Sequence, residues 1–410
     1  MKHRLSTIVL FALAVCFCLL YLPELTYGQG SQYTYPYSSN QTSYGLYPNT
    51  DTIRPVTIMK PEKKRPWLAA GEVFALNIGV WLFDLYILDQ DYARITLKSM
   101  RRNLKTGFVW DNDNFSINLL SHPYHGNLYF NSARSNGMNF WESIPFTFGG
   151  SLMWELFMET EPPSINDLFS TTMGGVALGE VTFRLSSLIL DNSKRGGERV
   201  WREFLGTAVS PMRTLNRIGR GEFTKRYAQN TFEHERMPVD MSVGVGWRYL
   251  AKNNYLFQGD NGMYIDFSLN YGDPFYYDTY KPFDFFTLKA MFNIIGGQPI
   301  VGSVNAMGML WGRSEEPMPG HDMTIGVFQH FDFYQTSKLK KSEVVPFEIA
   351  QSAAIGGGLL YKFPQIGNKI NMSYDIFANI IFMGGTYTDH FVIADRDYNM
   401  GSGFSLKLKY

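Results

Sequence analysis

Apolar and polar residues alternate with a period of two along the C-terminal part of the chain. In MYIDFSLNY (263–271) every second residue is apolar, and INMSYDIFANI (370–380) largely repeats the pattern. Such alternation is typical of a β-strand that has one apolar and one polar face. About eight segments of this kind are predicted, near 239–250, 262–272, 284–296, 299–312, 322–335, 347–363, 369–384 and 400–410.

The length of these segments indicates which kind of sheet they form. Each is long enough for the roughly 9–11 residues of a tilted membrane-spanning strand, whereas strands of soluble sandwiches average about 5–6 residues. The last segment ends on the aromatic Tyr410, which resembles the C-terminal strand signal of bacterial outer-membrane barrels. We therefore predict an antiparallel transmembrane β-barrel over 239–410, with a soluble sandwich as the alternative.

The polar faces of two predicted strands carry side chains that suit the narrow interior of a small barrel. His330, Asp332 and Tyr334 fall on one such face, and Asp375 and Asn379 fall on another.

The segment 67–192 lacks this alternation, and we predict a mainly helical module there. Periodicity does not decide between helix and strand for EVFALNIGVWLFDLYIL (72–88). From His122 onward helix is favoured, because Pro123 suits a first helical turn. The predicted fold class is therefore α+β, a helical module followed by the barrel.

Three further signals within the helical module concern its helix boundaries and its packing. Pro162 and Pro163 break the chain, and Ser164 with Asp167 three residues later predicts a helix N-terminus there. In the helix expected over about 165–192, Gly175 and Gly179 are four apart, a spacing that allows close helix packing.

Two other segments complete the predicted organisation. Residues 1–28 have a basic start, an apolar run and small residues before Gln29, which predicts a secretory signal peptide. Residues 29–66 are rich in Tyr, Ser, Asn and Pro and predict a flexible linker. Residues 193–238 are basic with scattered apolar residues, typical of a segment on an anionic membrane surface or of a solvated helical connector.

Composition narrows the function classes. The chain is 45% hydrophobic, 16% aromatic and only 18% charged, with a mean hydropathy of −0.16, which fits strands with one lipid-facing side. The net charge is near zero, so nucleic-acid binding is not expected. Cys16 and Cys18 both lie in the predicted signal peptide, so the mature chain has no cysteine ligand or nucleophile.

Ionisable residues in the apolar helical segments are the candidates for chemistry. His122 and His125 are three apart and share a helix face, as do Glu155 and Glu159, which are four apart. His122, His125 and Glu155 could together bind a divalent metal, the one candidate cofactor, which would activate a water for hydrolysis. Without a metal, Glu155, Glu159 and Asp167 could act as general acids or bases.

The alternative is that these groups hold the helices together as buried pairs, as Glu180 and Arg184, four apart, could do. His-x-x-His alone is a weak metal signal, since a zincin motif reads His-Glu-x-x-His.

Three motifs resemble an uncharacterised bacterial family of outer-membrane-associated proteins, catalogued as domain of unknown function 3943. They are HPYHGNLYFNSARSNGMNFWES, GGSLMWELFMETEPPSINDLFSTTMGGVALGE and SPMRTLNRIGRG, which occur in this order. The resemblance covers roughly residues 74–220. It implies the family and a location in the cell envelope, but no activity.

Together these observations predict a protein of the bacterial outer membrane whose helical module is periplasmic or membrane-associated. The expected role is an outer-membrane β-barrel protein that displays this module as a structural or interaction element. The alternative is a membrane-interface enzyme, such as a metal-dependent hydrolase acting on lipid or lipopolysaccharide. The expected partners are outer-membrane lipids, and also lipopolysaccharide or another envelope protein. Whether the protein is an enzyme stays open.

Overall fold

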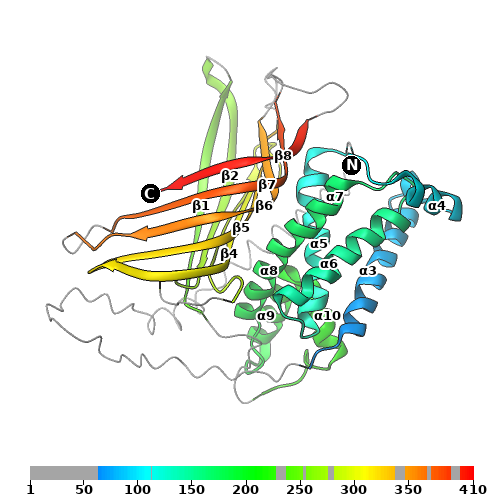
Figure 1. The fold of residues 1–410 in the computed structure, drawn as a ribbon, viewed down its shortest axis with the longest axis horizontal. Coiled ribbons are helices and arrows are strands. Elements are labelled where there is room, and N and C mark those ends of the chain that lie inside the picture. Colours follow the sequence, from blue (N-terminus) through cyan, green and yellow to red (C-terminus); the bar gives the residue numbers. More distant parts are fainter. Residues whose placement is uncertain are drawn as a thin grey trace.

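In a computed structural model, a layer of helices comes first and an antiparallel sheet follows, so the fold is α+β (Figure 1). The structure describes residues 63–111, 113–227, 237–252, 255–275, 281–337, 347–366, 371–388 and 398–410. The predicted signal peptide and almost all of the predicted linker lie outside these residues, so both stay predictions.

The helices occupy residues 66–219 of the chain. They are α3 (Pro66–Tyr86), α4 (Leu97–Thr106), α5 (His122–Ser135), α6 (Phe140–Phe157), α7 (Ile165–Phe169), α8 (Gly175–Ile189), α9 (Gly196–Val209) and α10 (Pro211–Gly219). A 3₁₀ turn η1 (Asp91–Ala93) and two π-helical turns, η2 (Ile117–Ser121) and η3 (Ser170–Gly174), connect them. The segment 72–88, for which periodicity did not decide between helix and strand, lies mainly in α3.

The start of α7 confirms the predicted helix N-terminus and adds a partner. The hydroxyl of Ser164 accepts a hydrogen bond from the backbone N–H of Asp167 at 3.2 Å, as the motif predicts. The backbone N–H of Ser164 donates instead to Glu155, which lies on another helix, at 2.7 Å.

Glycines set the close approach of α5 and α8. A side-chain carbon on Gly175 would lie 2.5 Å from the backbone of Gly126, and one on Gly179 would lie 2.7 Å from the ring of Phe130. The predicted role of the Gly175 and Gly179 spacing is therefore confirmed.

The described residues after the helices form eight strands, each pairing antiparallel with the next. They are β1 (Val239–Lys252), β2 (Tyr255–Tyr271), β3 (Phe286–Ile295), β4 (Val301–Met318), β5 (His321–Tyr334), β6 (Glu348–Lys362), β7 (Ser373–Tyr387) and β8 (Asn399–Lys409). They coincide closely with the eight predicted segments. A closed barrel would also need β1 to pair with β8, and among the described residues the sheet has no such pairing.

The sheet has an apolar face and a polar face, because directly paired residues of neighbouring strands point to the same side. One row of paired residues is apolar across β2 to β6: Phe267, Ala290, Val304, Phe333 and Ala350. The adjacent row is polar: Ser268, Lys289, Asn305, Asp332 and Gln351. The alternation in the sequence thus corresponds to two chemically different faces.

The sheet curls toward its polar face. Lys407 of β8 forms an ion pair with Asp332 of β5, although two strands lie between them. Phe328 and His330 of β5 both pack edge-on against Phe377 of β7, with ring centroids 5.1 and 5.0 Å apart. The sequence analysis expected His330 and Asp332 to face a narrow interior. In the structure both side chains lie on the inner side of the curled sheet.

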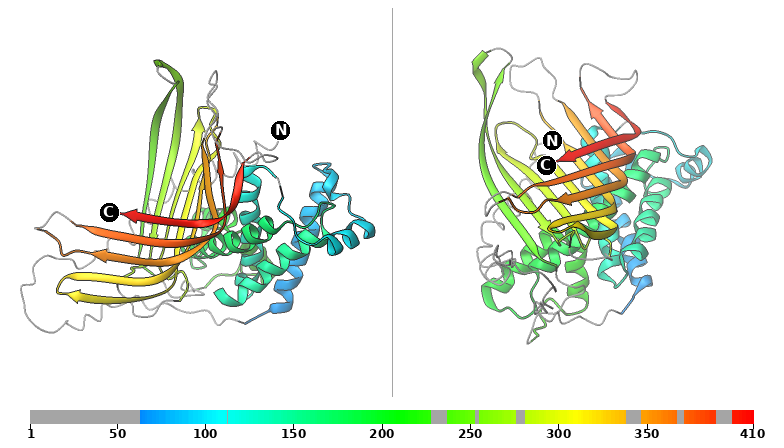
Figure 2. Two further views of the ribbon diagram at one scale, coloured as in Figure 1. Left: turned by 45° about the horizontal axis from the view of Figure 1, so that its top comes forward. Right: turned by 60° about the vertical axis from the view of Figure 1, so that its left-hand side comes forward.

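The helices lie against the sheet (Figure 2), and the two share one hydrophobic core. The buried side chains of Phe130 and Val181 in the helices belong to the same cluster as Phe267, Phe286 and Phe331 of the sheet's apolar face. The helical layer is therefore packed directly on the sheet and covers part of its apolar face.

The basic segment 193–238 contains α9 and α10, and its arginines are partly internal. Arg199, Arg213 and Arg217 are all buried. Arg217 donates to Glu203 at 2.5 Å and to Asn192 at 2.8 Å. Arginines used in this way serve packing, unlike the exposed basic residues of a membrane-surface segment or a solvated connector.

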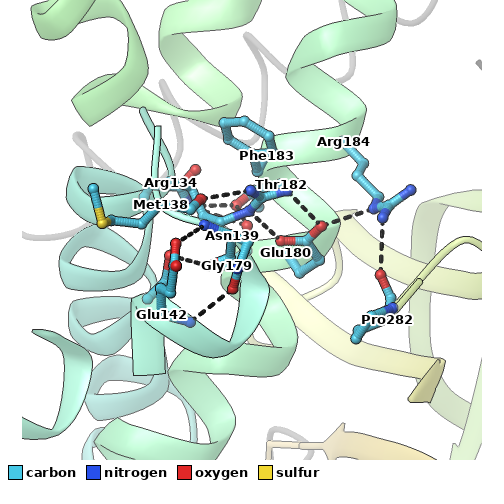
Figure 3. Close-up of polar contacts among 12 residues, drawn as sticks. Arg134, Met138, Asn139, Glu142, Gly179, Glu180, Thr182, Phe183, Arg184 and Pro282 are labelled. Atoms are coloured by element: carbon cyan, nitrogen blue, oxygen red, sulfur yellow. Dashed lines mark hydrogen bonds and ion pairs between the residues drawn. The ribbon is translucent and has the colours of Figure 1, made fainter. Parts of the chain in front are cut away.

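A buried ion-pair network joins the helical layer to the sheet (Figure 3). Glu180 of α8 is completely buried and accepts from Arg134 of α5 at 2.7 and 3.0 Å and from Arg184 at 2.8 Å. Arg184 also contacts Asp284 at 2.9 Å and donates to the carbonyl of Pro282 at 2.8 Å, both between β2 and β3. The predicted pair of Glu180 and Arg184 is confirmed, and Arg134 completes it.

Burial by itself raises the pKa of Glu180, but the charges and hydrogen bonds of Arg134 and Arg184 outweigh it and the pKa is lowered. The carboxylate therefore stays ionised inside the core. Removing one partner of such a buried set leaves the remaining charges uncompensated, which typically costs about 3–5 kcal/mol.

We predict that Glu180→Gln lowers the free energy of unfolding by about 3–5 kcal/mol, because it leaves the buried guanidinium of Arg134 without a carboxylate and that of Arg184 with Asp284 alone. Denaturant unfolding of the purified protein measures this loss. The control is Glu142→Gln, which breaks the exposed pair with Lys64 and should change stability little. Equal effects of the two substitutions would contradict the role assigned to the network.

Candidate functional site

The residues predicted to carry chemistry meet where α5 begins, α6 ends and α7 begins. His122 and His125 lie in the first turn of α5, and Glu155 lies in the last turn of α6. Glu159 follows α6, and Asp167 lies in the first turn of α7. The turn around Pro162 and Pro163 brings the end of α6 close to the start of α7.

Glu155 is the most buried member of this group. Only 1% of it is exposed, and its one hydrogen bond to the backbone is the one that Ser164 donates. Burial raises the pKa of Glu155 well above its usual value, and the nearby charges of Glu159 and Asp167 raise it further. Its surroundings therefore favour the protonated form of Glu155.

Glu159 and Asp167 behave in the same way. Burial, followed by the charge of Asp167, raises the pKa of Glu159 well above its usual value, while its hydrogen bond with Glu155 lowers it slightly. Burial raises the pKa of Asp167 to about 6, although the charge of His122 opposes this. Ionisation of one of these three carboxyl groups therefore makes ionisation of the others less favourable.

His122 and His125 have different surroundings. The Nε2 atom of His122 lies 3.6 Å from Oδ1 of Asp167, so an imidazolium there would face a carboxylate. His125 packs against Tyr129 and Trp154, with ring centroids 4.6 and 5.3 Å away. Burial lowers the pKa of His125 to about 3, so it is neutral and acts as part of the core.

Two acidic residues that the sequence analysis missed extend this group. Asp111 and Asp113 lie before α5, and their charges raise the pKa values of Glu159 and Asp167. Burial, followed by the charge of Asp111, raises the pKa of Asp113. The run DND at 111–113 was a visible signal, but it lies outside the apolar helices on which the prediction concentrated. We call Asp111, Asp113, Glu155, Glu159 and Asp167 the acidic cluster.

The chemistry open to the acidic cluster is proton transfer. Carboxyl groups with raised pKa values can donate or accept a proton near neutral pH. Among the described residues, no three His, Asp or Glu side chains are placed so that they could hold a metal ion together. The role of His122, His125 and Glu155 as metal ligands therefore stays a prediction.

The fold and these contacts define an α+β protein with a helical layer docked on an eight-stranded antiparallel sheet. Residues 107–212 match the family described as Domain of unknown function (DUF3943). This confirms the predicted resemblance and covers α5 to α9 together with the whole acidic cluster. No curated protein and no solved structure matched the chain.

We predict that the acidic cluster makes the protein more stable in mild acid. The pKa of Asp167 is about 6 when folded, against a usual value of 3.8, so the folded state binds this proton more tightly. Its stabilising effect is complete below 3.8 and is lost as the pH rises through about 6. Asp167→Asn, which has no proton to lose, should reduce the loss of stability between about pH 4 and 7.5 by about 2 kcal/mol.

Denaturant midpoints of the wild type and Asp167→Asn over this pH range test the prediction. Glu142→Gln is the control with the opposite sign. A hydrogen bond from Lys64 lowers the pKa of Glu142, so Glu142 stabilises the fold above its usual pKa and this effect is lost in acid. If Asp167→Asn leaves the pH dependence of stability unchanged, the folded protein does not bind the proton of Asp167 more tightly than the unfolded chain does.

Proposed function

We propose that this protein is a component of the bacterial outer membrane whose sheet is embedded in lipid and carries the helical layer as a structural or interaction element. The observation that carries the proposal is the apolar face of the sheet beyond the helices. On β7 and β8, Ile376 pairs with Leu408 and Ile380 with Phe404 on this face. All four side chains are exposed, and Leu406 between them is 68% exposed.

Lipid is the environment that suits this surface. Water-soluble proteins seldom expose a continuous apolar area of this kind, since its contact with water is unfavourable. The strands are 10 to 18 residues long, enough to cross the hydrocarbon core when tilted. The other face is polar and curls inward, the arrangement that membrane barrels use. Outer-membrane lipids are thus the proposed partners, together with lipopolysaccharide or another envelope protein.

Labels on one strand test the lipid contact of the sheet. Val245 and Ser242 are both exposed on β1, but Val245 lies on the apolar face and Ser242 on the polar face. We predict that an environment-sensitive fluorophore at Val245→Cys or Leu406→Cys, in nanodiscs, emits at short wavelength and is quenched by spin-labelled lipids. The same fluorophore at Ser242→Cys should be quenched by water-soluble reagents. Three labels with the same response would contradict an embedded sheet.

A second candidate is an enzyme at the membrane interface, acting on lipid or lipopolysaccharide. The acidic cluster favours it, because buried carboxyl groups with raised pKa values beside His122 are typical of acid–base catalysis. The structural role is the stronger proposal, since Glu155 already caps α7 through Ser164.

Metal content separates these two candidates. If the group is structural, we predict that His122→Ala/Glu155→Ala lowers the unfolding temperature of the purified protein while its bound metal stays equal to that of the wild type. Glu142→Gln serves as the control for loss of an exposed carboxylate. One equivalent of a divalent metal in the wild type, lost in a variant that remains folded, would favour the metal-dependent hydrolase instead.

A further inference from the structure

The helix α3 buries the polar residues Asn77 and Asp84 and exposes many of its large apolar residues. Its buried residues are Ala69, Val73, Asn77 and Asp84. The amide of Asn77 donates to the carbonyl of Gly150 at 3.0 Å and accepts a hydrogen bond from Tyr129. In a helix that faces water the polar residues point outward, so α3 has the reverse arrangement.

The outer side of α3 is strongly apolar. Its large exposed residues are Trp67, Leu68, Phe74, Leu82, Phe83 and Tyr86. Figure 1 places α3 on the side of the helical layer that faces away from the sheet. The described elements therefore leave this apolar side without a protein neighbour.

The helix α6 beside it repeats this arrangement. Ser143, Thr147 and Ser151, four apart from one another, are buried together with Glu155. The hydroxyls of Ser143 and Thr147 donate to the carbonyls four residues earlier, at 2.8 and 3.2 Å. Trp141 and Phe148 are exposed. Two helices with the same reversed polarity indicate an apolar environment on their outer sides.

The length of α3 fits a bilayer. Within the described residues it is the helix that is long and apolar enough to cross a membrane. Trp67 and Tyr86 mark its two ends and are 88% and 74% exposed. At about 1.5 Å per residue they are about 28 Å apart, close to the thickness of the hydrocarbon core, and interfacial aromatic residues typically occupy such positions.

The helix α4, which follows α3, is cationic on its exposed side. Its sequence LKSMRRNLKT has four basic residues and no acidic one. Lys98, Arg101, Arg102 and Lys105 line a shallow hollow together with Leu97 and Thr106. Leu97 and Leu104, seven residues apart and so on the same side, are 73% and 57% exposed. Apolar residues flanked by cations are typical of a helix that lies among anionic lipid headgroups.

We infer that the outer sides of α3 and α6 lie in the hydrocarbon of the bilayer and that α4 binds anionic lipid headgroups at its surface. This rests on the proposed embedding of the sheet and extends it to the helical layer. The positive charge of α4 and the length of the apolar side of α3 favour lipid over a second copy of the chain. A protein partner would need acidic groups opposite α4 but an apolar surface about 28 Å long opposite α3.

Fluorophores on the full-length chain, with Cys16→Ala/Cys18→Ala as background, test this inference in nanodiscs of phosphatidylcholine alone or with phosphatidylglycerol. Phe74→Cys reports on α3, Phe148→Cys on α6, Leu104→Cys on α4, and Leu406→Cys on the sheet. We expect spin-labelled lipids to quench the labels at Phe74 and Phe148 in both kinds of nanodisc. The label at Leu104 should shift to shorter wavelength only where phosphatidylglycerol is present.

Charge variants separate specific headgroup binding from general attraction. Lys98→Gln/Arg101→Gln/Lys105→Gln should abolish the phosphatidylglycerol response of the Leu104 label. Arg195→Gln/Lys225→Gln/Arg226→Gln removes the same charge from exposed residues before α9 and after α10 and should leave the response intact. Equal loss in both triple variants would overturn the role of α4.

The outcomes for the two proposals differ. A water-exposed label at Phe74 beside a lipid-quenched label at Leu406 would overturn this inference and leave the embedded sheet standing. A water-exposed label at Leu406 would overturn the embedded sheet itself. A label at Phe74 that is shielded from water but not quenched by spin-labelled lipid would overturn the inference in favour of a protein partner.

Discussion

Glu180 carries its charge where no water reaches it, so Arg134 and Arg184 have to stay beside it for the fold to form. Arg134 belongs to α5, and Arg184 reaches Asp284 between two strands of the sheet. One carboxylate therefore ties together two helices and the sheet. The glycines at 126 and 175 make this possible, because α5 and α8 approach closely enough only without side chains at their contact.

The acidic cluster shows what happens to buried carboxyl groups without such partners. The pKa of Glu180 is lowered by two guanidinium groups, whereas the pKa values of Glu155, Glu159 and Asp167 are raised by burial and by neighbouring carboxylates of the acidic cluster. Glu155, Asp167 and Glu180 all lie on helices of the same layer. The difference between Glu180 and the two similarly buried residues Glu155 and Asp167 lies in the charge of their neighbours.

The two apolar surfaces of the molecule have a common cause in the proposed membrane environment. The sheet exposes Phe404, Leu406 and Leu408 where the helices do not cover it, and α3 exposes Trp67 and Phe74 on the far side of the layer. Meanwhile polar groups such as Asn77 and Glu155 point inward, where hydrogen bonds satisfy them. A bilayer reverses the usual preference, because unpaired polar groups are costly in hydrocarbon and apolar ones are not.

The sequence by itself determined the eight strands and the two faces of the sheet, because the alternation of apolar and polar residues is a local property with a period of two. It also determined the start of α7 at Ser164 and the pair of Glu180 with Arg184, which lie within four residues of their partners. Only the tertiary structure decided that Arg134 joins Glu180, 46 residues away, and that Asp111 and Asp113 lie near Asp167. It alone showed the helices packed on the sheet and the arginines of the basic segment turned inward. Contacts between distant residues depend on how whole elements pack, and no local pattern in one sequence records that packing.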